Sequence, residues 1–198
     1  WKIPRAITAD RTARDKRLVD MTITSRIRVF RSSPRIEIKT SFANRALDHR
    51  LRMHVPVPVE CRDAIADGHF AHIQRKFQER TTKKHDTEEP VTHHMRHFVA
   101  LSGRKHGMAV LSPVLTEYQV LEEGKREKKL AITLLRSVNY LSRSDLLTRP
   151  TKAGPQIETP EAQCFGPFET EYAMLPLSGK NAAEEVGPLA AGGSIARH

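Results

Sequence analysis

Apolar and polar residues alternate along most of the chain, which is the pattern of strands with one buried face. In the first such segment Ile23, Ile27 and Val29 share one parity, and after a short Ser/Pro turn the alternation resumes at residues 36–42. These two segments predict a β-hairpin. Because residues 51–57 continue the same alternation, the sequence predicts three consecutive antiparallel strands.

The rest of the chain predicts further strands and few helices. The expected strands cover residues 69–77, 97–101, 108–111, 117–121, 130–138 and 168–177. The run 130–138 is the most apolar and most β-like, so we expect it in the centre of a sheet. Residues 78–92 have almost no apolar content and are typical of an exposed loop. Many strands joined by closely spaced turns predict an all-β protein with a large antiparallel β-sandwich.

The pattern also predicts how the chain divides. Residues 1–18 are polar and lack a sustained period, so we expect a connector or an irregular edge there. Residues 19–177 form the predicted sandwich domain. Residues 178–198 are rich in small residues and glycine, which predicts a tail or a linker to a further domain. Because the chain opens on Trp1 and not on Met, we expect it to be a segment of something longer.

A long polar loop follows the apolar run 130–138. Residues 142–164 are polar and charged, and four proline or glycine residues interrupt them, at 150, 154, 155 and 160. This composition favours an ordered loop over a helix or a strand. Two interpretations remain open at this point: a crossover that closes the sandwich, or a loop that faces a substrate.

Composition narrows the class of protein. The chain has 198 residues, of which 38% are hydrophobic, and its apolar runs are too short to span a bilayer. Cys61 and Cys164 lie far apart without a CxxC partner, so the sequence predicts a reduced, cytoplasmic protein without a disulfide framework.

The net charge of +10 raises the alternative of a basic nucleic-acid-binding domain. The excess is N-terminal, because residues 1–54 hold 14 Lys and Arg against 5 Asp and Glu, whereas residues 130–198 hold 6 against 7. Many of these cations alternate with apolar residues, as on the solvated face of a strand. Aromatic residues make up only 6% of the chain, so stacking platforms for bases are not evident.

The residues alone do not assemble a complete active site. Of the ten histidines, His69 and His72, like His94 and His97, fall on opposite faces of their expected strands, so neither pair can chelate a metal. Two of the loop acids Asp145, Glu158 and Glu161 are candidates for a carboxylate pair, although acids in loops are usually just solvated. The sequence has no GxSxG motif and no glycine-rich phosphate loop. We therefore predict no metal site and no catalytic residue in this chain.

Five blocks resemble, in order, the C-terminal part of glycoside hydrolase family 38, the α-mannosidases and mannosylglycerate hydrolases. The blocks are IKTSFANRALDHRLRMHVPVP (38–58), HMRHFVALSGRKHGMAVLSPVLTEYQVL (94–121), LLRSVNYLSRSDLLTR (134–149), GPQIETPEAQC (154–164) and EYAMLP (171–176). The resemblance implies a supersandwich of the galactose-mutarotase-like kind that follows a catalytic barrel and a helical bundle. In that family a barrel zinc ion binds the mannoside and a barrel aspartate is the nucleophile. Neither part has a match here.

The resemblance therefore implies a supporting role. We expect the chain to be part of a retaining, α-mannosidase-like glycosidase, to pack against the barrel and helical domains, and to line part of the α-mannoside site. We expect zinc only in the missing catalytic domain, and no hydrolysis by this chain alone. The rim candidates are Arg136, Asn139, Tyr140, Arg143 and Asp145. Their alternative is a purely structural role, with Arg136 paired to a neighbouring acid, and the alternative function is a stand-alone carbohydrate-binding module.

Overall fold

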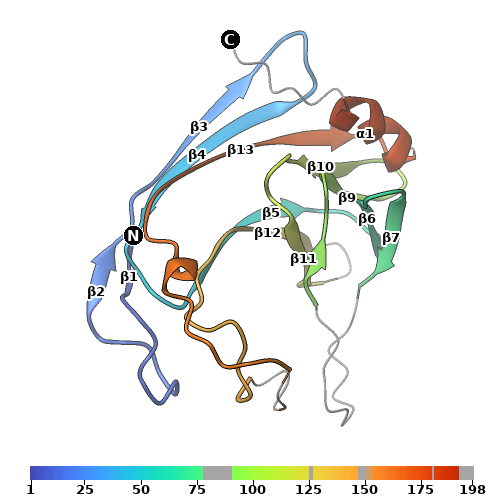
Figure 1. Cartoon of the computed structure of the whole chain (residues 1–198). Helices are drawn as coiled ribbons and strands as arrows, with labels where there is room; N and C mark the ends of the chain where they lie inside the picture. Colours follow the sequence, from blue (N-terminus) through green and yellow to red (C-terminus); the bar gives the residue numbers. More distant parts are fainter. Residues whose placement is uncertain (78–90, 125–126, 147–150, 152, 180, 192–198) are drawn as a thin grey trace.

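The computed structural model describes residues 1–77, 91–124, 127–146, 151, 153–179 and 181–191. Two antiparallel sheets face each other, and a helix covers the outside of the larger one (Figure 1). The all-β sandwich that the alternation predicts is thus confirmed. Residues 78–90, in the loop expected at 78–92, lie outside the described residues.

The larger sheet has seven strands in the order β3-β4-β13-β10-β9-β6-β7. Their bounds are β3 Ile23–Val29, β4 Ile36–Asn44, β6 Asp63–Asp67, β7 His72–Lys76, β9 Phe98–Ser102, β10 Gly107–Leu111 and β13 Gly166–Leu177. The hairpin predicted from the sequence, β3-β4, is confirmed by its antiparallel register, and the strands expected at 97–101 and 108–111 form a second hairpin, β9-β10. The last strand, β13, lies between β4 and β10 and so joins the two halves of the sheet.

The smaller sheet has the order β5-β12-β11-β8. Its strands are β5 Arg50–Val57, β8 His93–His94, β11 Glu117–Glu122 and β12 Lys128–Arg136. The central place of β12, the apolar run of the sequence, is confirmed, because β5 and β11 pair with its two edges. β5 is a strand as predicted, but it belongs to this sheet. The expected run of three consecutive antiparallel strands therefore ends after two, since the turn at Asp48, with φ of 50°, directs the chain to the other layer.

The main core lies between the sheets. Val55, Leu130 and Ile132 of the small sheet and Val99 and Val110 of the large sheet belong to one buried cluster. Each strand gives alternate residues to this cluster, which is why the alternation was visible in the sequence.

A second cluster lies on the outer face of the large sheet. It contains Phe98, Leu175 and Leu177, and α1 (Ala182–Ala191) covers it with Ala182 and Val186. The sequence predicted a tail or linker over residues 178–198 and no helix there, whereas its first part folds onto the sheet. Among the described residues, no helix is long and apolar enough to cross a membrane.

The N-terminal residues form a separate two-stranded sheet of β1 (Lys2–Pro4) and β2 (Leu18–Asp20). The turn between them reaches towards the loop that follows β12, because Arg11 contacts Asp145. The segment expected to be a connector or irregular edge thus lies against the loop whose function the sequence left open.

Candidate functional site

The long loop begins where β12 ends and returns to the sheet through a short 3-10 helix, η1 (Pro160–Gln163). Its two arms are joined by backbone hydrogen bonds. The amide of Val138 donates to the carbonyl of Ala162 (3.1 Å), that of Thr159 to Asn139 (2.9 Å), and that of Leu141 to Ile157 (2.9 Å). The described parts of the loop therefore form an ordered arm, whereas residues 147–150 and 152 lie outside the described residues.

A buried polar network fixes this arm to the sandwich. The Gln163 side chain, 4% exposed, donates from Nε2 to Asp48 Oδ1 (2.9 Å), and its Oε1 accepts from the Asp48 amide (3.0 Å) and the Ser137 hydroxyl (2.8 Å). Asn44, at the end of β4, donates to the carbonyls of Gln163 and Cys164, both at 2.9 Å. Because buried polar groups are costly when unpaired, these bonds hold the loop in one arrangement.

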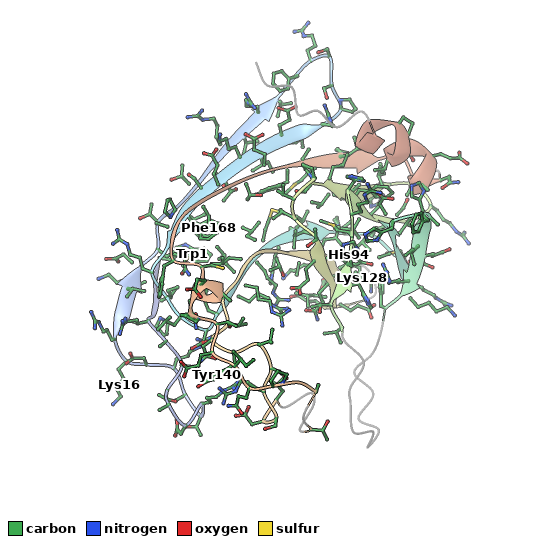
Figure 2. All side chains as sticks on the ribbon, in the orientation of Figure 1. Trp1, Lys16, His94, Lys128, Tyr140 and Phe168 are labelled. Atoms are coloured by element: carbon green, nitrogen blue, oxygen red, sulfur yellow. The ribbon has the colours of Figure 1, made fainter. Side chains whose placement is uncertain are left out.

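A pocket of about 890 Å³ lies between this arm and the N-terminal turn. Ile7, Thr8, Ala9 and Arg11 line it from the N-terminal turn, residues 136–143 line it from the arm, and Asp48 also contributes. Figure 2 shows Tyr140 on this side of the molecule, away from Lys128 and His94. Four of the five predicted rim residues line the pocket, and the fifth, Asp145, is bonded to two of the arginines that line it.

Arg143, which lines the pocket, forms a bidentate ion pair with Asp145. Arg143 donates through Nε and Nη2 to the two carboxylate oxygens of Asp145, at 2.8 and 2.7 Å, and Arg11 adds a longer contact at 3.4 Å. The Arg143 guanidinium also lies over the Tyr140 ring, 4.8 Å from its centroid. The hydrogen bonds from Arg143 lower the pKa of Asp145 to about 2. Asp145 is therefore an ionised anchor and not a proton donor.

The other loop acids have their own roles. Glu158 accepts a hydrogen bond from the Tyr140 hydroxyl at 3.3 Å, and Glu161 lies in the first turn of η1, where its carbonyl accepts from the amide of Cys164. Asp145 is engaged by arginines. The carboxylates of Asp145 and Glu158 thus bind separate partners, and the structure lends no support to a carboxylate pair.

Arg136 lines the pocket and is far more exposed than Arg143. Its side chain is 64% exposed, against 20% for Arg143. One Nη donates to Glu117 at 3.4 Å, and Glu117 also contacts Arg50 at 3.3 Å. Arg136 thus has the neighbouring acidic partner that a purely structural role would need. The nitrogen–oxygen distance is long, however, and most of the side chain is open to solvent.

The sequence reasoning missed three residues that hold the site: Asn44, Asp48 and Gln163. His49 follows Asp48 in the chain but does not line the pocket. Both ring nitrogens of His49 are buried, and neither has a hydrogen-bond partner in the described structure. Burial, followed by the charge of Arg14, lowers the pKa of His49, so the ring is neutral near pH 7. The block of residues 154–164 contained Gln163, but nothing local distinguished it from a solvated loop residue.

The described residues contain no group of three His, Cys, Asp or Glu side chains placed to hold a metal ion. The histidines have structural contacts instead. His69 stacks on His94 with centroids 5.4 Å apart, and His97 Nδ1 is 2.6 Å from a carboxylate oxygen of Asp67.

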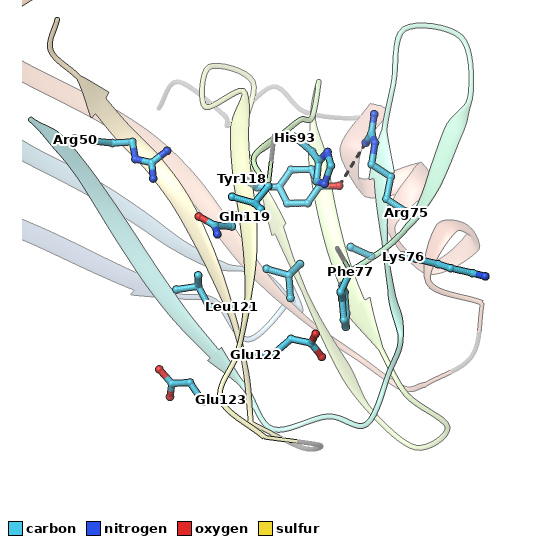
Figure 3. A pocket seen from close by; sticks show the side chains of 13 residues that line it. Arg50, Arg75, Lys76, Phe77, His93, Tyr118, Gln119, Leu121, Glu122 and Glu123 are labelled. Atoms are coloured by element: carbon cyan, nitrogen blue, oxygen red, sulfur yellow. Dashed lines mark hydrogen bonds between the residues drawn. The ribbon is translucent and has the colours of Figure 1, made fainter. Parts of the chain in front are cut away.

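A second pocket, of about 660 Å³, lies between β7 and β11 (Figure 3). Arg75 and Phe77 come from one side, and Tyr118, whose hydroxyl accepts from Arg75 at 3.4 Å, comes from the other. None of the predicted rim residues lines this pocket. We assign it no role.

The fold and the loop pocket together define a β-sandwich domain with a polar pocket at the end of its central strand. Residues 6–150 match the family described as the glycosyl hydrolases family 38 C-terminal domain. The chain therefore belongs to this family, as the ordered blocks of the sequence indicated.

Individual relatives agree with this assignment. A curated protein of Halalkalibacterium halodurans, named "Putative mannosylglycerate hydrolase", is 30% identical over 172 residues, which are 86% of this chain and 17% of that protein. Two solved structures from Enterococcus faecalis share the fold. One is an alpha-mannosidase (TM-score 0.74, 24% identity, 90% of this chain and 18% of that one), and the other is a protein in glycosyl hydrolase family 38 (TM-score 0.77, 21% identity, 96% and 22%). The chain thus spans about a fifth of the length of these relatives.

Proposed function

We propose that this domain supports, and partly lines, the active site of a zinc-dependent α-mannosidase-like barrel in the same polypeptide. The observation that carries the proposal is the convergence of the predicted rim residues on one pocket, held in place by the buried Gln163 network. The family assignment supports it, because the relatives are much longer chains. In this division of labour the barrel supplies the zinc ion and the nucleophile, and this chain supplies polar groups at the rim.

Arg136 and Asn139 are the residues best placed to touch a substrate. Arg143 and Asp145 bind each other, and Tyr140 lies under Arg143, so these three shape the wall. The exposed guanidinium of Arg136 suits sugar hydroxyls or a carboxylate such as that of mannosylglycerate. The binding would then be shared between the barrel and the sandwich.

The test is steady-state kinetics of the complete polypeptide on an aryl α-mannoside and on mannosylglycerate. We expect Arg136→Gln to lower kcat/KM about 10- to 100-fold, the value of one or two hydrogen bonds to a charged group. Arg104→Gln, at an exposed arginine in the β9-β10 turn, is the matched control and should leave kcat/KM unchanged. Equal activity of both variants would refute a substrate contact at Arg136.

The isolated chain provides the second arm of the test. We expect it to have no zinc-dependent turnover, and robust turnover would contradict the proposed division of labour. Calorimetry of the isolated chain with mannose and mannosylglycerate tests the carbohydrate-binding-module alternative. We expect no measurable binding, because Arg143 covers one face of the Tyr140 ring that would otherwise stack on a sugar.

The nucleic-acid alternative predicts DNA affinity that falls steeply with salt. Several N-terminal cations already have acidic partners on the sheet or the loop: Arg28 pairs with Glu37, and Lys39 with Glu169 and Glu171. We therefore expect no DNA binding at low salt.

A further inference from the structure

The edge strand β3 has an apolar face turned to the same side as the core. In its register with β4, Ile27 lies opposite Ile38 and Val29 lies opposite Ile36. Ile38 belongs to the buried cluster between the two sheets, and Ile36 packs against that cluster. The residues between them on β3, such as Arg28, point to the outer face. β3 therefore has the pattern of a strand with one buried face.

This face is uncovered in the described structure. Ile27 is 62% exposed and Val29 is 72% exposed, although their partners on β4 are buried or half-buried. The reason lies in the two layers: the large sheet has seven strands and the small sheet has four, with β5 at its edge. The second layer does not extend over β3.

The free edge of β3 carries its charges, Arg26 and Arg28, on the outer face only, and it lacks the other features by which sheet edges avoid further pairing. It pairs with β4 over seven residues without a register shift, and it contains neither Pro nor Gly nor an inward-pointing charge. β5, at the edge of the small sheet, contains Pro56. A long, regular edge strand with an apolar face is the form that accepts another strand.

We propose that β-strands of the same polypeptide, outside these 198 residues, pair with the β3 edge and cover Ile27 and Val29. A second copy of the chain is a weaker occupant. A second copy that paired edge to edge through β3 would only continue the sheet sideways. The side chains of Ile27 and Val29 project perpendicular to the sheet, so covering them also needs strands in the second layer. The relatives supply the length for such strands, because this chain corresponds to only 17–22% of them. The proposal is independent of the function of the loop pocket.

The test compares two faces of one strand in the complete polypeptide. Val29→Lys places a charge on the inward face, whereas Thr24→Lys places the same side chain on the exposed outward face and is the matched control. We expect Val29→Lys to lower the thermal midpoint by about 5 °C or more, and Thr24→Lys to change it by about 1 °C or less. Equal midpoints would overturn the proposal, since Val29 would then be as exposed in the whole protein as it is in this domain.

Hydrogen exchange of the unchanged polypeptide is the second measurement, and it does not depend on a variant that folds. If another strand pairs with β3, all of its amides between residues 23 and 29 should exchange about 100-fold or more slowly than unprotected amides. Free exchange at every second amide would overturn the pairing. Sedimentation decides the occupant: a dimer that Val29→Lys converts to monomer would assign the face to a second copy and overturn the proposal.

Discussion

Gln163 joins the long loop after β12 to the sandwich, and its replacement by glutamate is a sharp test of that connection. The change keeps the shape of the side chain but replaces the amide that donates to Asp48 Oδ1 at 2.9 Å. At neutral pH two carboxylates then face each other in a site where Gln163 is only 4% exposed. At low pH the introduced carboxyl can carry a proton and donate it to Asp48, which restores the lost hydrogen bond.

The expected loss of stability follows from the repulsion between the introduced carboxylate and that of Asp48. Two carboxylates that share a site raise one pKa by roughly two to three units, and each unit corresponds to about 1.4 kcal/mol. The introduced group thus has a folded-state pKa above its unfolded value of about 4.3. Stability is therefore retained below about pH 4 and is lost as the pH rises through the folded-state pKa. We expect Gln163→Glu to cost about 3 kcal/mol at pH 7.5 and less than about 1 kcal/mol at pH 4.

The assay is urea unfolding of the domain at both pH values, beside the unchanged chain and Gln163→Leu. The leucine variant removes the bonds to Asp48 and Ser137 at any pH, so its cost of roughly 2–4 kcal/mol should not follow the same pH dependence. The reasoning is refuted if Gln163→Glu is as stable as the unchanged chain at pH 7.5, or if its deficit is the same at both pH values.

Three further predictions concern other parts of the chain. Val186→Asp puts an unpaired charge under α1 and should cost about 3 kcal/mol or more in urea unfolding, whereas Glu184→Asp on the same helix should be nearly neutral. Burial raises the pKa of Cys61 to about 11, so iodoacetamide at pH 8 should alkylate it about a hundredfold more slowly than a thiol of pKa 9.0, and labelling at the rate of a free thiol would contradict its burial. The Asp145 carboxyl should titrate near pH 2 by NMR and move towards 3.8 in Arg143→Gln, while an unchanged midpoint would show that Arg143 is not the cause.

The five rim residues were chosen by resemblance to a family. Four of them line one pocket, and the fifth, Asp145, is bonded to two of the arginines that line it. Their contact with a substrate stays a prediction, which the kinetics of Arg136→Gln test.

The sequence by itself determined most of the strands and which of their faces is buried. This information is local, because side chains alternate along a strand whatever its partners are. The run 130–138 could be placed at the centre of a sheet from its apolar content alone, and β12 lies there. The hairpins β3-β4 and β9-β10 were also predictable from local sequence, because a short turn between two strands fixes their pairing.

Only the tertiary structure decided how the strands are shared between the layers and how the loop is held. β5 leaves the sheet of β3 and β4, and β13 inserts between β4 and β10, because each gains its partner from a distant part of the chain. The bonds of Gln163 to Asp48 span 115 residues, so no local pattern encodes them. The same holds for α1, whose apolar side chains are buried only because the outer face of the large sheet is also apolar.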